Sequence, residues 1–223
     1  MFGVGFISGI GITLFIISMY ACLVVSSKSD KEEWCLRYKY SDAELKKLLK
    51  NLCIVIDTRE QVNKHITDYF DKKKIKYKIR KLDQGDYSCY IESNEETKPL
   101  GVTRDWYFDN KIAVERKNSV DELIQSIKDR DRFENEFARL KMYGIKVHMI
   151  IEDKDFYTKL ATGDYRSEYK KESAVASYET LISRYDISVQ GHEKREVGYR
   201  IHKICYYFVR ELIKNIGYME GGK

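Results

Sequence analysis

The segment Ile112–Lys117 constrains the fold of this chain more than any other stretch. It opens with three apolar residues and continues directly with Glu-Arg-Lys, without a turn residue between them. Because side chains alternate between the two faces of a strand, we expect Glu115 and Lys117 to share one face and Arg116 to point to the other. A carboxylate and an ammonium group side by side at the edge of a core can hold a cation and a water molecule. The segment therefore predicts a buried strand that ends in a charged site.

Two further carboxylates occur where a chain can bring them to such a site. Asp86 follows Gly85, and glycine at a turn lets the backbone approach closely. Asp57 ends the apolar run Cys53–Ile56, where an unpaired buried carboxylate is costly unless it meets a cation. Carboxylates for a hard divalent cation, with a lysine to steer water, are the groups that metal-assisted phosphodiester hydrolysis needs.

The order Gly85-Asp86, then Glu115-Arg116-Lys117, then Asp121 resembles the signature of the XPF-type structure-specific nucleases. These enzymes are a branch of the restriction-endonuclease-like superfamily. The run Ile54–Glu60 resembles the opening strand of the family and its Asp-x-Arg-Glu motif, and Arg132–Glu136 follows the main signature. The resemblance covers about residues 53–214, which is most of the chain.

This resemblance implies an α/β fold of the restriction-endonuclease-like type, with a central mixed sheet flanked by helices. It implies a divalent-metal-dependent DNA endonuclease that uses Mg²⁺ or Mn²⁺. By resemblance, Asp57, Asp86 and Glu115 are catalytic metal ligands, and Lys117 is the catalytic residue that positions and polarises the attacking water. The supporting residues carried over from the motifs are Glu60, Asp121, Arg59, Arg116 and Arg132.

Each of these residues also has an ordinary structural role to weigh against the catalytic one. Glu60 and Asp121 suit the first turn of a helix, where the helix dipole favours a carboxylate. The three arginines suit structural ion pairs, and Lys117 suits a surface lysine with a buried stem. The combined pattern favours the catalytic interpretation, because any one piece alone is a weak signal.

The resemblance also suggests a substrate, branched or flap DNA, in repair, recombination or phage DNA processing. The compact form resembles versions encoded by bacteriophages, and we expect no helix-hairpin-helix domain after the nuclease fold. Residues 195–216 are the candidate surface for a homodimer, and a partner protein is the other option. The alternative function is a catalytically silent, membrane-tethered DNA-binding or scaffold module, which the intact Asp86, Glu115 and Lys117 set disfavours.

A basic cluster follows the first predicted strand and helix. Within a net charge of +5, seven of the ten residues from position 72 to 81 are Lys or Arg. Such a cluster suits a phosphate backbone or an anionic membrane surface, and a solvated lysine-rich helix end is an equal alternative. We expect these residues to bind DNA: Lys72, Lys73, Lys74, Lys76, Lys78, Arg80 and Lys81.

The amino-terminal residues predict a membrane anchor at 1–27. Residues 4–25 are mostly apolar and long enough as a helix to span a bilayer, and no Lys or Arg precedes them, which disfavours a cleaved signal peptide. Lysines follow at once, so the nuclease domain is expected to face the cytoplasm. A start of translation after this segment would leave the domain cytoplasmic. Residues 28–51 are expected to form an amphipathic linker helix and residues 52–217 the nuclease domain.

Other local patterns predict elements and exclude other kinds of site. Thr58 with Gln61, and Ser119 with Glu122, each predict a capping box that opens a helix. Strands alternating with helices indicate an α/β sandwich, and residues 92–110 indicate an insertion or extra hairpin. The five cysteines form no Cys-x-x-Cys and the four histidines show no ligand spacing, so neither a disulfide framework nor a structural zinc site is expected.

Overall fold

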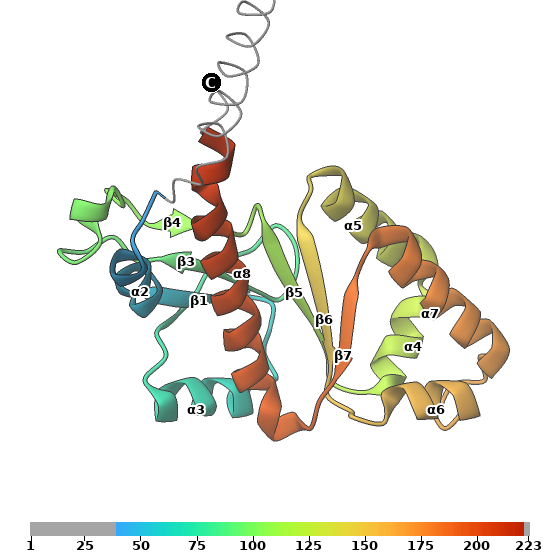
Figure 1. Cartoon of the computed structure of the whole chain (residues 1–223). Helices are drawn as coiled ribbons and strands as arrows, with labels where there is room; N and C mark the ends of the chain where they lie inside the picture. Colours follow the sequence, from blue (N-terminus) through green and yellow to red (C-terminus); the bar gives the residue numbers. More distant parts are fainter. Residues whose placement is uncertain (1–38, 221–223) are drawn as a thin grey trace, which may run out of the picture. The chain divides into compact units, whose positions relative to one another are not determined.

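The computed structural model describes the backbone of residues 39–220 and the side chains as far as residue 216. Residues 40–214 form one compact unit (Figure 1). Its strands are β1 (Leu52–Ile56), β2 (Tyr77–Ile79), β3 (Tyr87–Ile91), β4 (Trp106–Tyr107), β5 (Ile112–Lys117), β6 (Lys146–Ile151) and β7 (Ser188–Gly191). Its helices are α2 (Asp42–Lys50), α3 (Lys64–Lys73), α4 (Val120–Lys128), α5 (Arg130–Met142), α6 (Phe156–Thr162), α7 (Lys171–Tyr185) and α8 (Val197–Glu220), with short 3₁₀ turns η1 (Lys98–Leu100) and η2 (Lys194–Glu196).

The sheet is mixed, with the strand order β2-β1-β3-β5-β6-β7 and β4 paired to β3. Strand β3 is antiparallel to both β1 and β5, whereas β2 is parallel to β1 and β6 and β7 continue parallel to β5. The carboxyl ends of β1 and β5 therefore meet at the same edge, where β3 begins. This topology brings Asp57, Asp86 and the Glu-Arg-Lys segment to one edge, and it confirms the predicted mixed sheet flanked by helices.

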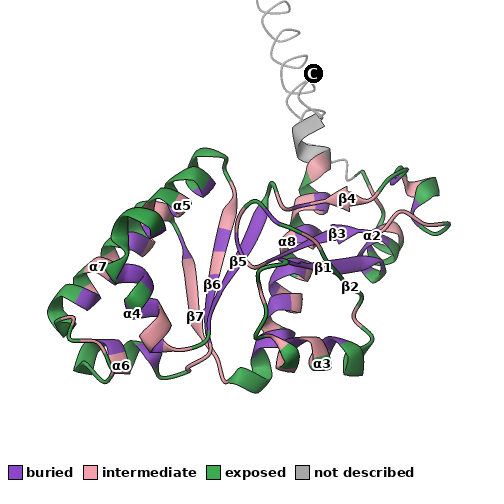
Figure 2. Ribbon diagram, turned by 180° about the vertical axis from the view of Figure 1, so that it is seen from behind, coloured by how far each residue is buried: buried purple, intermediate pink, exposed green. Residues whose placement is uncertain are grey.

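Two groups of helices cover the two faces of the sheet (Figures 1 and 2). Helices α4 to α7 share a hydrophobic core with one face of β5 and β6, which includes Ala113 and Met149. Helix α8 crosses the other face near β3, where the Cys205 thiol lies 3.9 Å from the Ser88 carbonyl oxygen. Residues on alternate positions of β5 thus face different helices, as the strand pattern predicts.

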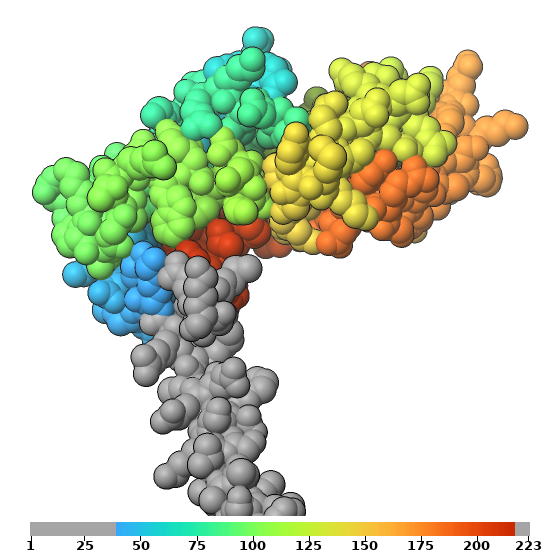
Figure 3. All heavy atoms as spheres, turned by 90° about the horizontal axis from the view of Figure 1, so that it is seen from above, coloured from blue at the N-terminus to red at the C-terminus, as the bar shows by residue number. Residues whose placement is uncertain are grey.

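The segment between β3 and β5 contains the predicted extra structure. Residues 92–110 hold the turn η1 and the short strand β4, whose Tyr107 stacks on Tyr90 with ring centroids 4.8 Å apart. Figure 3 shows this segment (green) on the side of the unit away from α6 and α7 (orange). It extends the sheet beside β3 and does not line the cavity described below.

The capping predictions were partly wrong. Helix α3 begins at Lys64, and no capping bond forms at Thr58, because Asp57 holds the following turn through the Arg59 backbone N–H. Ser119 does accept from the Glu122 N–H at 3.3 Å, but the Glu122 carboxylate accepts from Asn118 instead, so only half of that box forms. A complete capping box, which the sequence analysis missed, opens α2 between Ser41 and Glu44.

The predicted membrane anchor at residues 4–25 lies outside the described residues. Within residues 39–220, no helix is long and apolar enough to cross a membrane. The described part of the predicted linker helix is α2, which buries Leu45, Leu48 and Leu49 within the compact unit of residues 40–214. The domain boundaries themselves stay predictions.

Helix α2 provides a stability test, because Leu48 is completely buried. We expect Leu48→Ala to lower the free energy of unfolding by about 2–5 kcal/mol, the usual cost of a cavity in a packed core. Chemical denaturation followed by circular dichroism measures it, with Lys46→Ala on the exposed side of the same helix as the control. An effect no larger than that of the control would show that α2 is not part of the cooperative unit.

Candidate active site

A cavity of about 410 Å³ opens at the edge of the sheet where β5 ends. Asp86 at the start of β3 and the charged end of β5 form its floor, and the turn after β1 forms one wall. Gly85 has a φ of +72°, and a Cβ there would lie 3.0 Å from the Cβ of Ala113, so only glycine fits this approach without strain. The residues that line the cavity are Arg59, Glu60, Gln61, Val62, Asp86, Glu115, Arg116, Lys117, Asn118 and Glu122.

Glu115 and Lys117 point from β5 toward α5, on the face that they share with Ala113. The Lys117 Nζ donates to Glu115 Oε1 at 2.8 Å, lies 3.9 Å from Glu122 Oε1 and sits 5.2 Å from the ring centroid of Phe133. Burial works against the charge of Lys117, but the carboxylates around it, Glu115 foremost, outweigh burial and raise its pKa. The lysine is therefore a cation at neutral pH, held in place by its partners.

Asp86 is held at one oxygen by the backbone of β5. Its Oδ2 accepts from the Arg116 N–H at 2.7 Å. Burial and the nearby Glu115 raise the pKa of Asp86 well above its usual range, although this hydrogen bond and Lys117 act in the opposite direction. Two carboxylates that repel each other in one cavity are arranged as a pair of ligands for a cation.

Arg116 points to the opposite face and holds a second, buried ion-pair network. Its Nη1 donates to Glu60 Oε1 and its Nε donates to Glu152 Oε1, each at 2.8 Å, and the ring of His65 lies 2.5 Å from the same Glu152 oxygen. The Arg116 side chain is 4% exposed and Glu152 is 1% exposed. This network fixes the strand end that carries Glu115 and Lys117, and the sequence analysis missed the roles of Glu152 and His65.

Asp57 does not join the other two predicted metal ligands. Its carboxylate accepts from the Arg59 backbone N–H at 2.8 Å, from the Arg59 guanidinium at 2.7 and 3.1 Å, and from the Leu82 N–H at 2.6 Å. Burial opposes the ionised form, but these hydrogen bonds prevail and lower the pKa of Asp57. Its oxygens accept these hydrogen bonds and it does not line the cavity, and its role as a metal ligand stays a prediction. Arg59 does line the cavity and pairs with Asp57.

Two of the predicted supporting residues lie outside the cavity. Asp121 accepts from the backbone and the guanidinium of Arg166, at 2.8 and 3.0 Å, and so holds the loop after α6. Arg132 pairs with Asp129 at 3.1 Å and its side chain is 77% exposed. Glu136, one helical turn beyond Arg132, was missed: burial and the nearby Glu115 raise its pKa, which places a further carboxyl group beside the site.

The predicted DNA-binding cluster is divided between two ends of the sheet. Lys76 lies beside Ile54 near the start of β1, together with the end of α3 that carries Lys72 to Lys74. The Arg80 backbone N–H donates to the Ile56 carbonyl oxygen at the carboxyl end of β1, and Lys81 follows Arg80 in the chain. Three members of the cluster also have side-chain partners: Lys76 pairs with Glu92, Lys78 contacts the Tyr107 hydroxyl at 3.3 Å, and Arg80 pairs with Asp109. The cluster thus extends along β2 and the segments on either side of it, and its role in DNA binding stays a prediction.

The residues at the cavity fit a hard divalent cation in their chemistry, although they are few. Among the described residues, no three carboxylate, histidine or cysteine side chains converge on one point. The pair Asp86 and Glu115 supplies the charged oxygen ligands that Mg²⁺ or Mn²⁺ prefers, and burial together with the nearby Glu115 raises the pKa of Asp86. Mg²⁺ usually keeps several waters and takes only one or two protein carboxylates.

Comparisons with known proteins agree with this geometry. The family model described as the ERCC4 domain matches residues 56–196. The fold is similar to XPF from Aeropyrum pernix, with 18% identity and a TM-score of 0.50, over 72% of this chain and 66% of that one. The structure of the same archaeal protein in complex with DNA matches equally well, over 71% of this chain. The chain thus spans just under two thirds of that protein, and no curated protein matches it.

The mixed sheet brings two carboxylates and a lysine to one cavity at its edge. The chain belongs to the ERCC4 domain family and carries an XPF-type nuclease domain, as its motifs predicted.

Asp86 and Glu115 repel each other in the cavity, so removing the charge of Asp86 should stabilise the fold. In the absence of metal ions, we expect Asp86→Asn to raise the free energy of unfolding at pH 7 by on the order of 1 kcal/mol, because the amide keeps an acceptor for Arg116 and carries no charge. A raised folded-state pKa means that the wild-type penalty vanishes as the pH falls and Asp86 takes up a proton. The gain should therefore shrink toward low pH.

Urea denaturation at several pH values, in the presence of a chelator, measures this difference. The control is Asp83→Asn, because Asp83 is exposed and lies outside this cavity. A loss of stability in Asp86→Asn at pH 7 would show that the hydrogen bond to Arg116 outweighs the repulsion between the carboxylates.

Proposed function

We propose that this protein is a divalent-metal-dependent DNA endonuclease that hydrolyses phosphodiester bonds in branched or flap DNA. The observation that carries the proposal is the position of Lys117, a buried cation bonded to Glu115 in a cavity that also holds Asp86. Burying three consecutive charged residues at a strand end is costly and gives no packing advantage over apolar residues. A catalytically silent module has no use for this arrangement.

The charge state of Lys117 assigns its part in the reaction. Since its pKa is raised, it keeps its proton at neutral pH and does not act as the base. It donates hydrogen bonds, so it orients the attacking water and stabilises the negative charge that develops on the phosphoryl oxygens. Asp86 and Glu115 would hold the metal ion, which when bound polarises the phosphate and lowers the pKa of water. The Arg116 network keeps these groups in register.

The preference for branched or flap DNA and the choice of Mg²⁺ or Mn²⁺ rest on the family motifs. Anchoring in a membrane through residues 4–25, with the nuclease domain facing the cytoplasm, stays a prediction, as do the roles in repair, recombination or phage DNA processing. A homodimer through residues 195–216 also stays a prediction.

Cleavage of labelled fork, flap and plain duplex DNA by the full chain tests the proposal. With Mg²⁺ or Mn²⁺ we expect cutting that a chelator abolishes and that Lys117→Ala or Glu115→Gln lowers by roughly a hundredfold or more, the usual cost of one preorganised electrostatic group. The control is Lys171→Ala, because Lys171 is an exposed lysine at the start of α7, outside the cavity. If the folded wild-type protein cut none of these substrates with either metal, the scaffold alternative would replace this function.

A further inference from the structure

The catalytic cavity continues into a second hollow on the α3 side. This hollow has a volume of about 480 Å³ and shares Gln61 and Val62 with the first. Val62 stands between them and is 70% exposed, which is unusual for an aliphatic residue beside polar groups. The residues that line the second hollow are Gln61, Val62, Lys64, His65, Asp68 and Lys194. The two hollows together form a trough that leads away from Asp86 and Glu115.

The trough ends where α8 begins. Lys194 belongs to η2, directly before α8, and η2 lies against α3. At the first turn of α8, a Cβ on Gly198 would lie 2.9–3.1 Å from the Tyr69 side chain of α3, so the two helices touch there. The next residue, Tyr199, is 48% exposed and lies in the first turn of α8, after the end of the trough.

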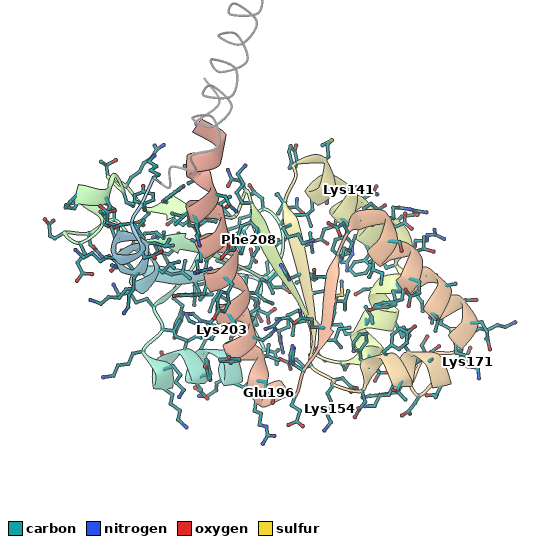
Figure 4. The ribbon with its side chains drawn as sticks, in the orientation of Figure 1. Lys141, Lys154, Lys171, Glu196, Lys203 and Phe208 are labelled. Carbon is teal, nitrogen blue, oxygen red and sulfur yellow. The ribbon has the colours of Figure 1, made fainter. Side chains whose placement is uncertain are left out.

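The outer face of α8 bears a cluster of one lysine and three tyrosines. Lys203 Nζ lies 5.5, 5.7 and 5.8 Å from the ring centroids of Tyr199, Tyr206 and Tyr207. These spacings of three and four residues place the four side chains on one side of the helix. Tyr199 and Tyr207 are 48% and 55% exposed, whereas Tyr206 is half-buried and packs edge-on against Tyr207, and Figure 4 shows Lys203 on α8 above α3. We call these four residues the α8 cluster.

The side chains of the α8 cluster indicate which kind of molecule it binds. It combines exposed aromatic rings, on which bases stack, with an ammonium group for a phosphate, and it has no acidic member. The bases of a duplex are stacked on one another and leave no free face, whereas unpaired bases do. A second copy of the chain is the other candidate for this surface, and the mass measurement below distinguishes it from DNA.

We propose that the trough and the α8 cluster bind an unpaired strand of the DNA substrate as it leaves the catalytic cavity. This inference rests on the proposed nuclease function and deepens it, because it identifies the part of the protein that recognises a branch. Lys64 and Lys194 contact the backbone along the trough, and Tyr199 and Tyr207 stack on bases beyond it. Duplex DNA lacks free base faces for these tyrosines and binds more weakly.

Fluorescence anisotropy of the full chain with a labelled oligothymidylate, without divalent cations, tests the proposal apart from cleavage. We expect Tyr199→Ala and Tyr207→Ala each to weaken single-strand binding by at least about fivefold, the loss that removing one stacking platform usually causes. Tyr199→Phe keeps the ring and should bind like the wild type. Lys203→Ala should also reduce the slope of log Kd against log salt by about 0.7, because one phosphate contact is lost.

The matched controls are Tyr157→Ala on α6 and Lys171→Ala on α7. Tyr157 is 47% exposed, nearly the same fraction as the 48% of Tyr199. Lys171 lies at the far end of the unit from α8 (Figure 4). Neither control should change single-strand binding. Thermal unfolding of every variant confirms that the fold is intact, and light scattering records the mass of each.

Unchanged single-strand binding in the folded Tyr199→Ala, Tyr207→Ala and Lys203→Ala variants would overturn the proposal. A lower mass in these variants with unchanged DNA binding would overturn it as well and identify the α8 cluster as a protein interface. The proposed nuclease function is judged separately: a wild type that cleaves DNA while these variants bind normally defeats only this inference. A wild type that binds single strands through α8 but never cleaves defeats only the nuclease.

Discussion

The burial of three consecutive charges at the end of β5 is the constraint to which the surrounding structure responds. Glu115, Arg116 and Lys117 are each less than a tenth exposed, and an unpaired charge at this depth would cost several kcal/mol. Because side chains alternate along the strand, the three residues point to two faces of the sheet. On the α5 side, Lys117 pairs with Glu115. On the α3 side, Arg116 pairs with Glu60 and Glu152. The turn after β1, the end of β6 and α3 are thereby tied to one strand end.

The two faces of β5 differ in how their charged groups are held. On the α3 side, two carboxylates and a histidine surround one arginine, and the hydrogen bonds are short and buried. On the α5 side, Asp86, Glu115 and Glu136 outnumber Lys117, and repulsion from Glu115 together with burial raises the pKa values of Asp86 and Glu136. A buried network of ion pairs thus supports a face on which carboxylates repel one another. This is the arrangement expected of a site that gives up stability for function.

Local patterns predicted the elements well where periodicity and burial agree. The apolar run at β1, the helix start at Ser119 and the alternation of β5 correspond to the helices and strands observed. The Thr58 capping box failed, although its residue types were right, because Asp57 binds the Arg59 N–H and forms a turn before any helix can start. The second oxygen of Asp57 accepts from the Leu82 N–H, which comes from a distant loop. No spacing rule includes that loop, so the surroundings of Asp57 were not predictable from the local sequence.

By itself the sequence determined the family, the order of the elements and three members of the site, Asp86, Glu115 and Lys117, because the family motifs are local and strand alternation follows from backbone geometry. Only the tertiary structure decided which carboxylates share the cavity and which serve as structural clamps. It also brought Glu152, His65 and Glu136 to the site and divided the basic cluster between two ends of the sheet. Those outcomes depend on strand order and direction, which bring together side chains far apart in the chain and which no short motif encodes.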